Sequence, residues 1–441
     1  MDASSVQQTK LKPSLGLFDA TAISIGAIIG AGIFIVTGIA AGLAGSALVV
    51  SMLIAAVIAL LTALSLAELT AWQPLEGSIY EYAYRLISPF AGFLAGWIWV
   101  LSNTFAGAAV SLGFAYYLAT LAPVLSVNLI AAIVCMSFTT LNFIGIRQSA
   151  FANNILVTAK LLILVFFIVT GFCFIRVENF SRFEPFKAGV FYGAFYIFFA
   201  YGGFARVAVV AEEVRNARKN VPKAILLSLV ISTLVYILVG TIAVGLAGAS
   251  DLSSSKSPLT DAISMTGSTA AVYIVSAGGL LATASVLLTS ILGVSRMVYA
   301  MARRRDLPQA MSKLHARFGT PYYSIWIIGV LMTVLALFVD LSRIIAISTF
   351  ALLFYYALAN ASALRLRIGK RLYPRVIPVL GLATCLILMA CIPLEAWMMG
   401  SAGLAAGVAF YWMKRRFLAC GKNATSSVFK SASDLESSII F

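Results

Sequence analysis

The chain has 441 residues, of which 61% are hydrophobic and 11% are charged, and its formal net charge is +15. Soluble domains carry about 25% charged residues, so this composition excludes a soluble protein and indicates an integral membrane protein. Most lysines and arginines fall in segments that the positive-inside rule assigns to the cytoplasm. The positive charge therefore indicates topology and some affinity for membrane lipid, and it does not indicate nucleic-acid binding.

Apolar segments long enough to cross a bilayer, at about twenty residues each, predict about twelve transmembrane helices. In chain order the expected spans are 18–42, 46–70, 89–120, 127–144, 153–175, 189–213, 223–247, 267–300, 322–339, 342–364, 375–391 and 393–413. The polar segments 1–14 and 417–441 are expected to be cytoplasmic tails. The sequence thus predicts a multi-pass, all-α protein of the cell membrane with both termini inside.

Two glycine-rich breaks interrupt apolar spans, one in the first span and one five spans later. They are Gly26-Ala-Ile-Ile-Gly-Ala-Gly32 and Ala200-Tyr-Gly-Gly203. Unwound peptides in a membrane helix are tolerated only where protein covers them or where they line a ligand cavity. Gly26-x-x-x-Gly30 also fits the spacing by which membrane helices pack closely. The extra Gly32 and the matching second break favour two discontinuous helices, which are typical of a transporter site.

The chemistry of the two breaks predicts a site for a zwitterion. Free amides at the start of the outer half-helix, with the positive end of its dipole, suit a carboxylate. Free carbonyls at the end of the inner half-helix suit an ammonium group. The groups are expected from Ile28, Ala31 and Gly32 in the first span, and from Phe199, Ala200 and Gly202 in the sixth. A site that binds both charges selects an α-amino acid.

Five motifs occur in a fixed order along the chain. They are Ile25-Gly-Ala-Ile-Ile-Gly-Ala-Gly-Ile-Phe34, Gly77-Ser-Ile-Tyr-Glu-Tyr82, Phe198-Phe-Ala-Tyr-Gly-Gly-Phe204, Ala211-Glu-Glu-Val-Arg-Asn216 and Ser295-Arg-Met-Val-Tyr-Ala-Met-Ala302. This set resembles the amino acid–polyamine–organocation (APC) transporters. The resemblance implies the five-plus-five inverted repeat of leucine-type sodium-coupled transporters, with broken first and sixth helices and alternating access. The repeats would be 15–175 and 176–366, followed by two peripheral helices in 367–416.

The same resemblance implies roles for individual residues. The substrate carboxylate would bind the amides of Ala31 and Gly32, and its amine would bind carbonyls of the two breaks. Ala106 of the third span would form the floor of the pocket. Phe199 occupies the position of an aromatic residue that closes over substrate from outside in relatives, although a phenylalanine in a chain with 29 of them is usually part of the core.

Lys160 places a charge inside the fifth span, where it is costly and by default suggests function. Its side chain could instead extend to the membrane surface, although it lies about two turns inside the helix. Burial favours the neutral form of an amine, so Lys160 could release and regain a proton during transport. The resemblance implies this coupling role, because proton-coupled members carry a lysine here whose ammonium replaces a sodium ion.

Arg206 follows the second break directly and is a candidate selectivity residue. Relatives commonly carry an acid at the preceding position, which is Ala205 here, and some that take cationic amino acids present a Glu where Ser102 aligns. Compared with those relatives, the site has therefore lost negative charge and gained a positive charge. This difference argues against arginine, lysine and polyamines as substrates. Alternatively, Arg206 pairs with a helix C-terminus or with a carboxylate such as Glu68.

The inner ends of the second, third and sixth spans are expected to carry a cluster of acids, Glu68, Glu76, Glu212 and Glu213. The resemblance implies an inner gate that closes through ion pairs with nearby arginines. Ordinary solvated helix ends are the alternative interpretation.

These observations predict a secondary active transporter of neutral amino acids, driven by protons or by exchange. A sodium-independent exchanger and a transporter of cationic amino acids or polyamines are the alternatives. A channel or receptor would need a charged pore ring or a signalling domain, and a membrane enzyme would need paired acids, a metal-ligand pattern or a nucleophile with its base. The sequence shows neither the features of a channel or receptor nor those of a membrane enzyme. No enzyme activity, cofactor or metal is therefore expected.

Overall fold

The computed structural model describes a defined part of the chain, which comprises residues 14–75, 77–121, 126–145, 150–367, 371–390 and 392–437, with side chains as far as Arg415. Within these residues the protein is helical, as expected, apart from one isolated bridge between Leu15 and Val214. Most of the expected tail 1–14 lies outside the described residues.

The described residues form helices in the following order. They are α1 (Leu17–Ile28), α2 (Ala31–Ala44), α3 (Leu48–Trp72), α4 (Ile79–Leu86), α5 (Pro89–Leu121), α6 (Val127–Ile144), α7 (Ala150–Phe172), α8 (Ala188–Tyr201), α9 (Arg206–Val209), α10 (Ala217–Ser254), α11 (Pro258–Ser264), α12 (Thr269–Arg303), α13 (Tyr322–Phe338), α14 (Leu341–Arg365), α15 (Val376–Ala390) and α16 (Leu394–Ser437). Four short 3₁₀ turns, η1 (Gly45–Ala47), η2 (Val177–Phe180), η3 (Ala211–Glu213) and η4 (Gln309–Ser312), lie between them.

The first expected span is broken at its glycines, as predicted. Helix α1 ends at Ile28 and α2 begins at Ala31, and the backbone of Gly30 has φ −125° and ψ −140°, which is not helical. The glycines also pack closely, which was the alternative interpretation. A Cβ on Gly26 would lie 2.7 Å from Val157 of α7, and one on Gly30 would lie 2.3 Å from Val286 of α12. Both explanations therefore hold at this position.

The sixth expected span is interrupted in the same way. Helix α8 ends at Tyr201, and the short helix α9 begins only at Arg206. The two breaks touch, because a Cβ on Gly203 would lie 2.3 Å from the carbonyl carbon of Ala27. A Cβ on Gly32 would likewise lie 2.5 Å from Cα of Ala200. Glycine is needed at both positions because backbone meets backbone there.

By length and composition, the described residues contain eight helical segments able to cross a membrane, or nine if α15 and α16 form one bent span. The prediction of about twelve is therefore not reproduced by this measure. One of the eight segments, Leu17–Trp72, has 56 residues and contains two of the expected spans, whereas α13, at 17 residues, is shorter than the others. The last helix also continues past 413, where its span was expected to end.

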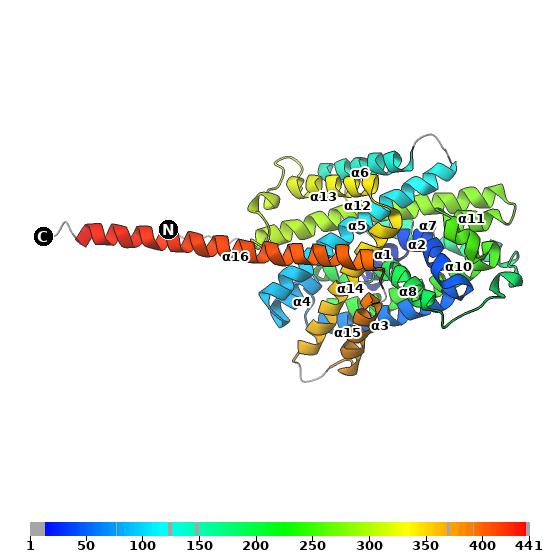
Figure 1. Ribbon diagram of the computed structural model, residues 1–441, viewed down its shortest axis with the longest axis horizontal. Coiled ribbons are helices and arrows are strands. Elements are labelled where there is room, and N and C mark those ends of the chain that lie inside the picture. The colour runs from blue at the N-terminus through cyan, green and yellow to red at the C-terminus, as the bar shows by residue number, and fades with distance from the viewer. Residues whose placement is uncertain are drawn as a thin grey trace.

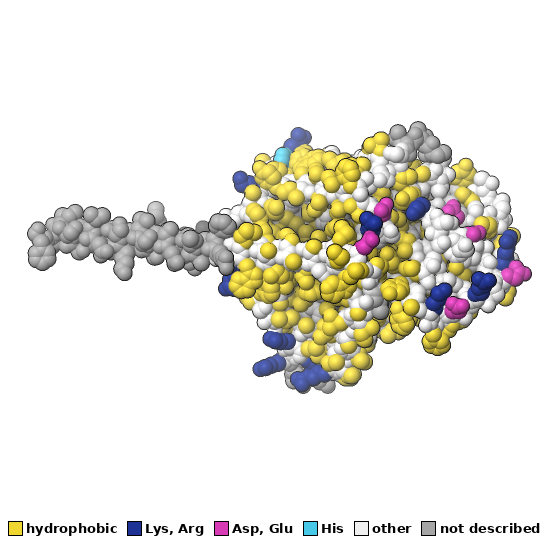
Figure 2. All heavy atoms as spheres, in the orientation of Figure 1, with side chains coloured by type: hydrophobic (Ala, Val, Ile, Leu, Met, Phe, Trp, Pro, Cys, Tyr) yellow, Lys and Arg dark blue, Asp and Glu magenta, His cyan; other side chains and the backbone are white. Residues whose placement is uncertain are grey.

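Four pairs of described helices that are five spans apart in the expected order pack against each other, and α5 with α12 and α6 with α13 can be followed in Figure 1. The pairs are α2 with α8, α3 with α10, α5 with α12, and α6 with α13. Figure 2 shows hydrophobic side chains across the middle of one face, with most charged side chains toward its margins. This distribution fits a multi-pass protein whose apolar flank faces lipid.

The contact between the two breaks gives a prediction about stability. Gly203→Ala should destabilise the protein by about 1–3 kcal/mol, because its Cβ would strike the Ala27 backbone, which no rotamer change can move away. Gly16→Ala is the matched control, since its Cβ would meet only Asp19 at an ordinary 3.6 Å. Thermal unfolding in detergent measures both variants, and equal melting temperatures would contradict the close approach.

Candidate functional site

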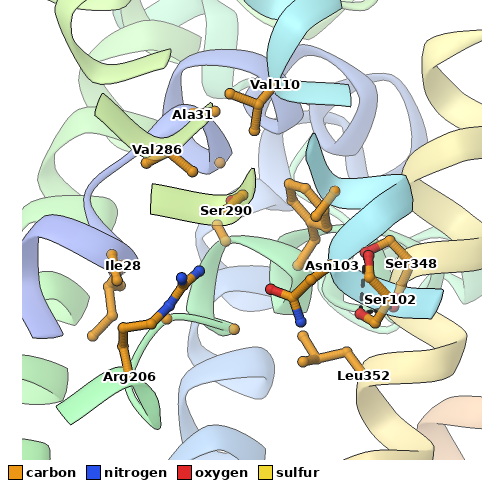
Figure 3. Close-up of a pocket in the computed structure, with 17 residues that line it drawn as sticks. Ile28, Ala31, Ser102, Asn103, Val110, Arg206, Val286, Ser290, Ser348 and Leu352 are labelled. Atoms are coloured by element: carbon orange, nitrogen blue, oxygen red, sulfur yellow. Dashed lines mark hydrogen bonds between the residues drawn. The ribbon is translucent and has the colours of Figure 1, made fainter. Parts of the chain in front are cut away.

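A cavity of about 60 Å³ lies where the two breaks face α5, α12 and α14 (Figure 3). Its volume is enough for several water molecules. The substrate residues expected from the sequence all line it: Ile28, Ala31, Gly32, Ala106, Phe199, Ala200 and Gly202. Arg206 lines it as well, and Lys160 and Glu68 do not. The structure therefore brings the two breaks together around one space.

The N-terminus of α2 presents amides to this cavity. Gly30 is its N-cap and supplies no side-chain cap, while the Gly30 amide itself donates to the carbonyl of Ile28 at 2.8 Å. The first amides of a helix have no partner within the helix, so Ala31 and Gly32 retain donors at the positive end of the dipole. This geometry suits an anionic oxygen.

Two tyrosines that the sequence analysis missed hold the carbonyls of the breaks. The Tyr236 hydroxyl, from α10, donates to the carbonyl of Ile28 at 2.5 Å and lies 3.1 Å from the carbonyl of Ala200. The Tyr356 hydroxyl, from α14, donates to the carbonyl of Gly202 at 2.7 Å. A carbonyl has two lone pairs, so those of Ala200 and Gly202 can each still accept a bond from a ligand. The carbonyl of Ile28, in contrast, already accepts from the Gly30 amide and from Tyr236. No local sequence signal identifies these tyrosines, because their partners are distant in the chain.

The serines on the opposite wall bind each other. The Ser102 hydroxyl donates to the carbonyl of Ser348 at 2.8 Å, and the Ser348 hydroxyl donates to the carbonyl of Ser102 at 2.8 Å. This reciprocal pair joins α5 to α14 beside the cavity. Ser102, where a Glu was considered, thus serves helix packing in this structure.

Arg206 enters the cavity from the start of α9 (Figure 3). Its Nη1 donates to the carbonyl of Thr289 on α12 at 3.3 Å. None of the ion pairs between described side chains includes it. The suggestion that Arg206 pairs with Glu68 is wrong, because Glu68 lies beside Arg371 instead, at 3.9 Å. The helix C-terminus is also not its partner, since Thr289 lies inside α12.

Glu68 is only 1% exposed, and neither of its carboxylate oxygens has a hydrogen-bond partner among the described residues. Arg371 donates to the carbonyls of Ala363 and Leu366 at the end of α14. The pair therefore joins α3 to the end of α14, at a distance from the cavity. A role for Glu68 in a gate stays a prediction, and Glu76 of the same expected cluster lies outside the described residues.

Lys160 is 2% exposed and lies behind the cavity wall. Its Nζ donates to the Ser285 hydroxyl of α12 at 2.5 Å and to the carbonyl of Gly26 in α1 at 3.4 Å. No carboxylate forms an ion pair with it in the part of the chain that the structure describes. The ammonium thus ties the inner half of the first broken helix to α7 and α12.

A second polar cluster, not anticipated from the sequence, lies where α4 meets the end of α12. Arg304 pairs with Glu81 at 2.7 Å, and Asp306 accepts hydrogen bonds from the Tyr80 hydroxyl at 2.8 Å and from Lys414 at 3.3 Å. Burial, and then the Asp306 charge, raise the pKa of Tyr80, so its hydroxyl stays protonated and donates. The cluster fixes α4 against the end of α12.

Comparisons with known proteins agree with this arrangement. Residues 15–414 match the family model described as amino acid permease. An uncharacterized transporter of Mycobacterium tuberculosis is 35% identical over 415 residues, covering 92% of each chain. The branched-chain amino acid permease BcaP of Bacillus subtilis is 31% identical over 88% of this chain and 90% of that protein. Cationic amino acid transporter 4 of Mus musculus is 32% identical over 83% of this chain and 61% of that protein.

The serine pair beside the cavity gives a second prediction. Ser102→Ala and Ser348→Ala should each cost about 0.5–1.5 kcal/mol, because each removes one hydroxyl that donates to the partner's backbone carbonyl. Unfolding in mixed detergent micelles measures both variants. Ser137→Ala is the control, because the Ser137 hydroxyl bonds only within its own helix and its loss should cost less. If neither Ser102→Ala nor Ser348→Ala destabilises the protein more than Ser137→Ala, the bonds between α5 and α14 contribute nothing and the prediction is wrong.

Proposed function

This chain belongs to the amino acid permease family of the APC superfamily, and from this premise we propose that it is a secondary active transporter of neutral α-amino acids. Alternating access between the two membrane faces would carry the substrate across, and both termini would lie in the cytoplasm. The proposed fold is the five-plus-five inverted repeat, with repeats at 15–175 and 176–366 and peripheral helices in 367–416. The pairing of helices five spans apart supports this repeat.

One observation carries the choice of substrate. The amide end of α2 and the carbonyls of Ala200 and Gly202, each with one acceptor position left, surround a single cavity. Such a site offers donors to a carboxylate and acceptors to an ammonium group, which are the two groups that every α-amino acid shares. Phe199 and Ala106 both line the cavity. In this proposal Phe199 closes over a bound substrate and Ala106 supplies a small apolar surface.

The side-chain preference rests on charge. None of the residues that line the cavity is an aspartate or glutamate, and Arg206 is among them. Two like charges at roughly 6 Å repel by about 3 kcal/mol at an effective dielectric near 20. That energy corresponds to about a hundredfold in affinity. Neutral substrates are therefore favoured over cationic amino acids and polyamines, although one relative is named as a cationic amino acid transporter.

The driving force is proposed to be a proton gradient that acts through Lys160. Protonated, its ammonium holds Gly26 of α1 against Ser285 of α12; neutral, it loses the charge that strengthens both bonds. Because Gly26 lies in the half-helix that ends at the cavity, proton release would loosen the inner side of the site. Sodium-independent exchange without proton coupling is the alternative.

Uptake into liposomes tests the function. Purified protein should take up labelled alanine or leucine, and unlabelled neutral amino acids should inhibit that uptake far more than arginine or putrescine. Arg206→Ala should narrow the difference, because it removes the like charge. If no amino acid is taken up, the transporter proposal fails; if arginine inhibits as well as leucine, the preference for neutral side chains fails.

The coupling has its own test. Lys160→Met should abolish the stimulation of uptake by an inward proton gradient, while exchange of substrate across the membrane persists to some degree. Lys256→Met is the matched control, since Lys256 is an exposed lysine between α10 and α11 and should leave the stimulation intact. A full response to the gradient in Lys160→Met would remove Lys160 from the coupling mechanism.

A further inference from the structure

The guanidinium of Arg206 has more donors than the protein uses. Arginine carries five N–H donors in a fixed fork. Among the described residues, its one hydrogen bond is from Nη1 to the carbonyl of Thr289. The side chain lines the cavity, and Figure 3 shows its guanidinium directed toward Ser290. The remaining donors are therefore available to a molecule in the cavity.

The neighbouring helix leaves space for this guanidinium. Gly293 of α12 lies beside Nη1, and a Cβ there would lie 3.2 Å from that atom and 3.5 Å from the ring of Trp99. Most residues other than glycine would force the guanidinium to move. Arg206 is thus held by the carbonyl of Thr289, in the space that is left because residue 293 is a glycine. No carboxylate of the described residues forms an ion pair with it.

Other polar groups surround this end of the cavity. The Ser290 hydroxyl, on α12, has no hydrogen bond among the described residues, and Asn103, on α5, faces the same space (Figure 3). Ala31, at the amide end of α2, lies at the opposite end of the view. The cavity therefore has donors at two places, the amide end of α2 and the Arg206 side chain.

We propose that the Arg206 end is a subsite for a hydrogen-bond acceptor on the substrate side chain. The inference rests on the proposed function, because it takes the amide end of α2 as the site of the α-carboxylate. The substrates would be small amino acids whose side chains carry an oxygen, such as threonine and asparagine. They would bind better than valine and leucine, which have nearly the same shapes.

This preference is opposite to that of an apolar pocket. A side-chain oxygen that leaves water without a new partner weakens binding, so an apolar pocket selects valine over threonine and leucine over asparagine. A hydrogen bond to a charged donor reverses the order. We expect threonine and asparagine each to bind at least about tenfold more tightly than their apolar counterparts.

Binding to the purified full-length protein, measured by competition in liposomes, tests the subsite with alanine, threonine, valine, asparagine and leucine. Alanine has no side-chain group beyond Cβ and reports on the α-amino acid site alone. Arg206→Met should abolish the tenfold preference within each pair, because it removes the charged donor. Gly293→Ala, whose Cβ would shift the guanidinium by a few tenths of an ångström without removing it, should reduce the preference only in part. Arg176→Met removes an exposed arginine elsewhere and should preserve the preference.

The outcomes separate the two proposals. If none of the five amino acids binds, the proposed function fails. If alanine binds and the unmutated protein shows no preference for the oxygen-bearing partner in either pair, the subsite is excluded, and this result needs no variant. A preference that survives both Arg206→Met and Gly293→Ala would also overturn it, because the acceptor would then be recognised by other groups.

Discussion

An unwound peptide inside a membrane has no water to satisfy it, and this constraint organises the middle of the molecule. The two breaks meet at Ala27 and Gly203, and hydroxyl groups from α10 and α14 reach in to bond their carbonyls. Tyr236 and Tyr356 thus satisfy carbonyl groups that are left without helical partners where α1 and α8 end. The cavity is the space that remains once these backbone groups have been secured, and its outline follows from them.

The positions of the breaks could be predicted from the sequence, because glycine within an apolar span is a local signal. The residues expected at the site, from Ile28 to Gly202, indeed line one cavity. What could not be predicted is which distant groups complete it. Ser348 bonds Ser102 across 246 residues, and Tyr236 bonds Ile28 across 208. Such contacts depend on how the helices pack in three dimensions, which cannot be predicted from residue spacing along the chain.

Other differences have equally physical causes. Glu68 was considered as a partner for Arg206 because both are charges in apolar helices, yet a residue of the segment after α14, Arg371, lies nearer. Counting spans by hydropathy assumed that each helix stops at the membrane surface. Helices α1, α2 and α3 instead form one continuous apolar stretch, because only short breaks separate them. Helix α16 extends beyond its apolar part, because a helix needs only intact backbone bonds to continue.

The Tyr236 hydroxyl has a single proton and faces two carbonyls, those of Ile28 and Ala200. It can therefore donate fully to only one of them at a time. If α1 and α8 shift against each other, the proton can follow whichever carbonyl comes closer, and one bond strengthens as the other weakens. The two broken helices can then move against each other while the Tyr236 hydroxyl changes its acceptor, so that no buried hydrogen bond is lost. A hinge inside a membrane protein needs this property, because an unpaired buried donor is costly.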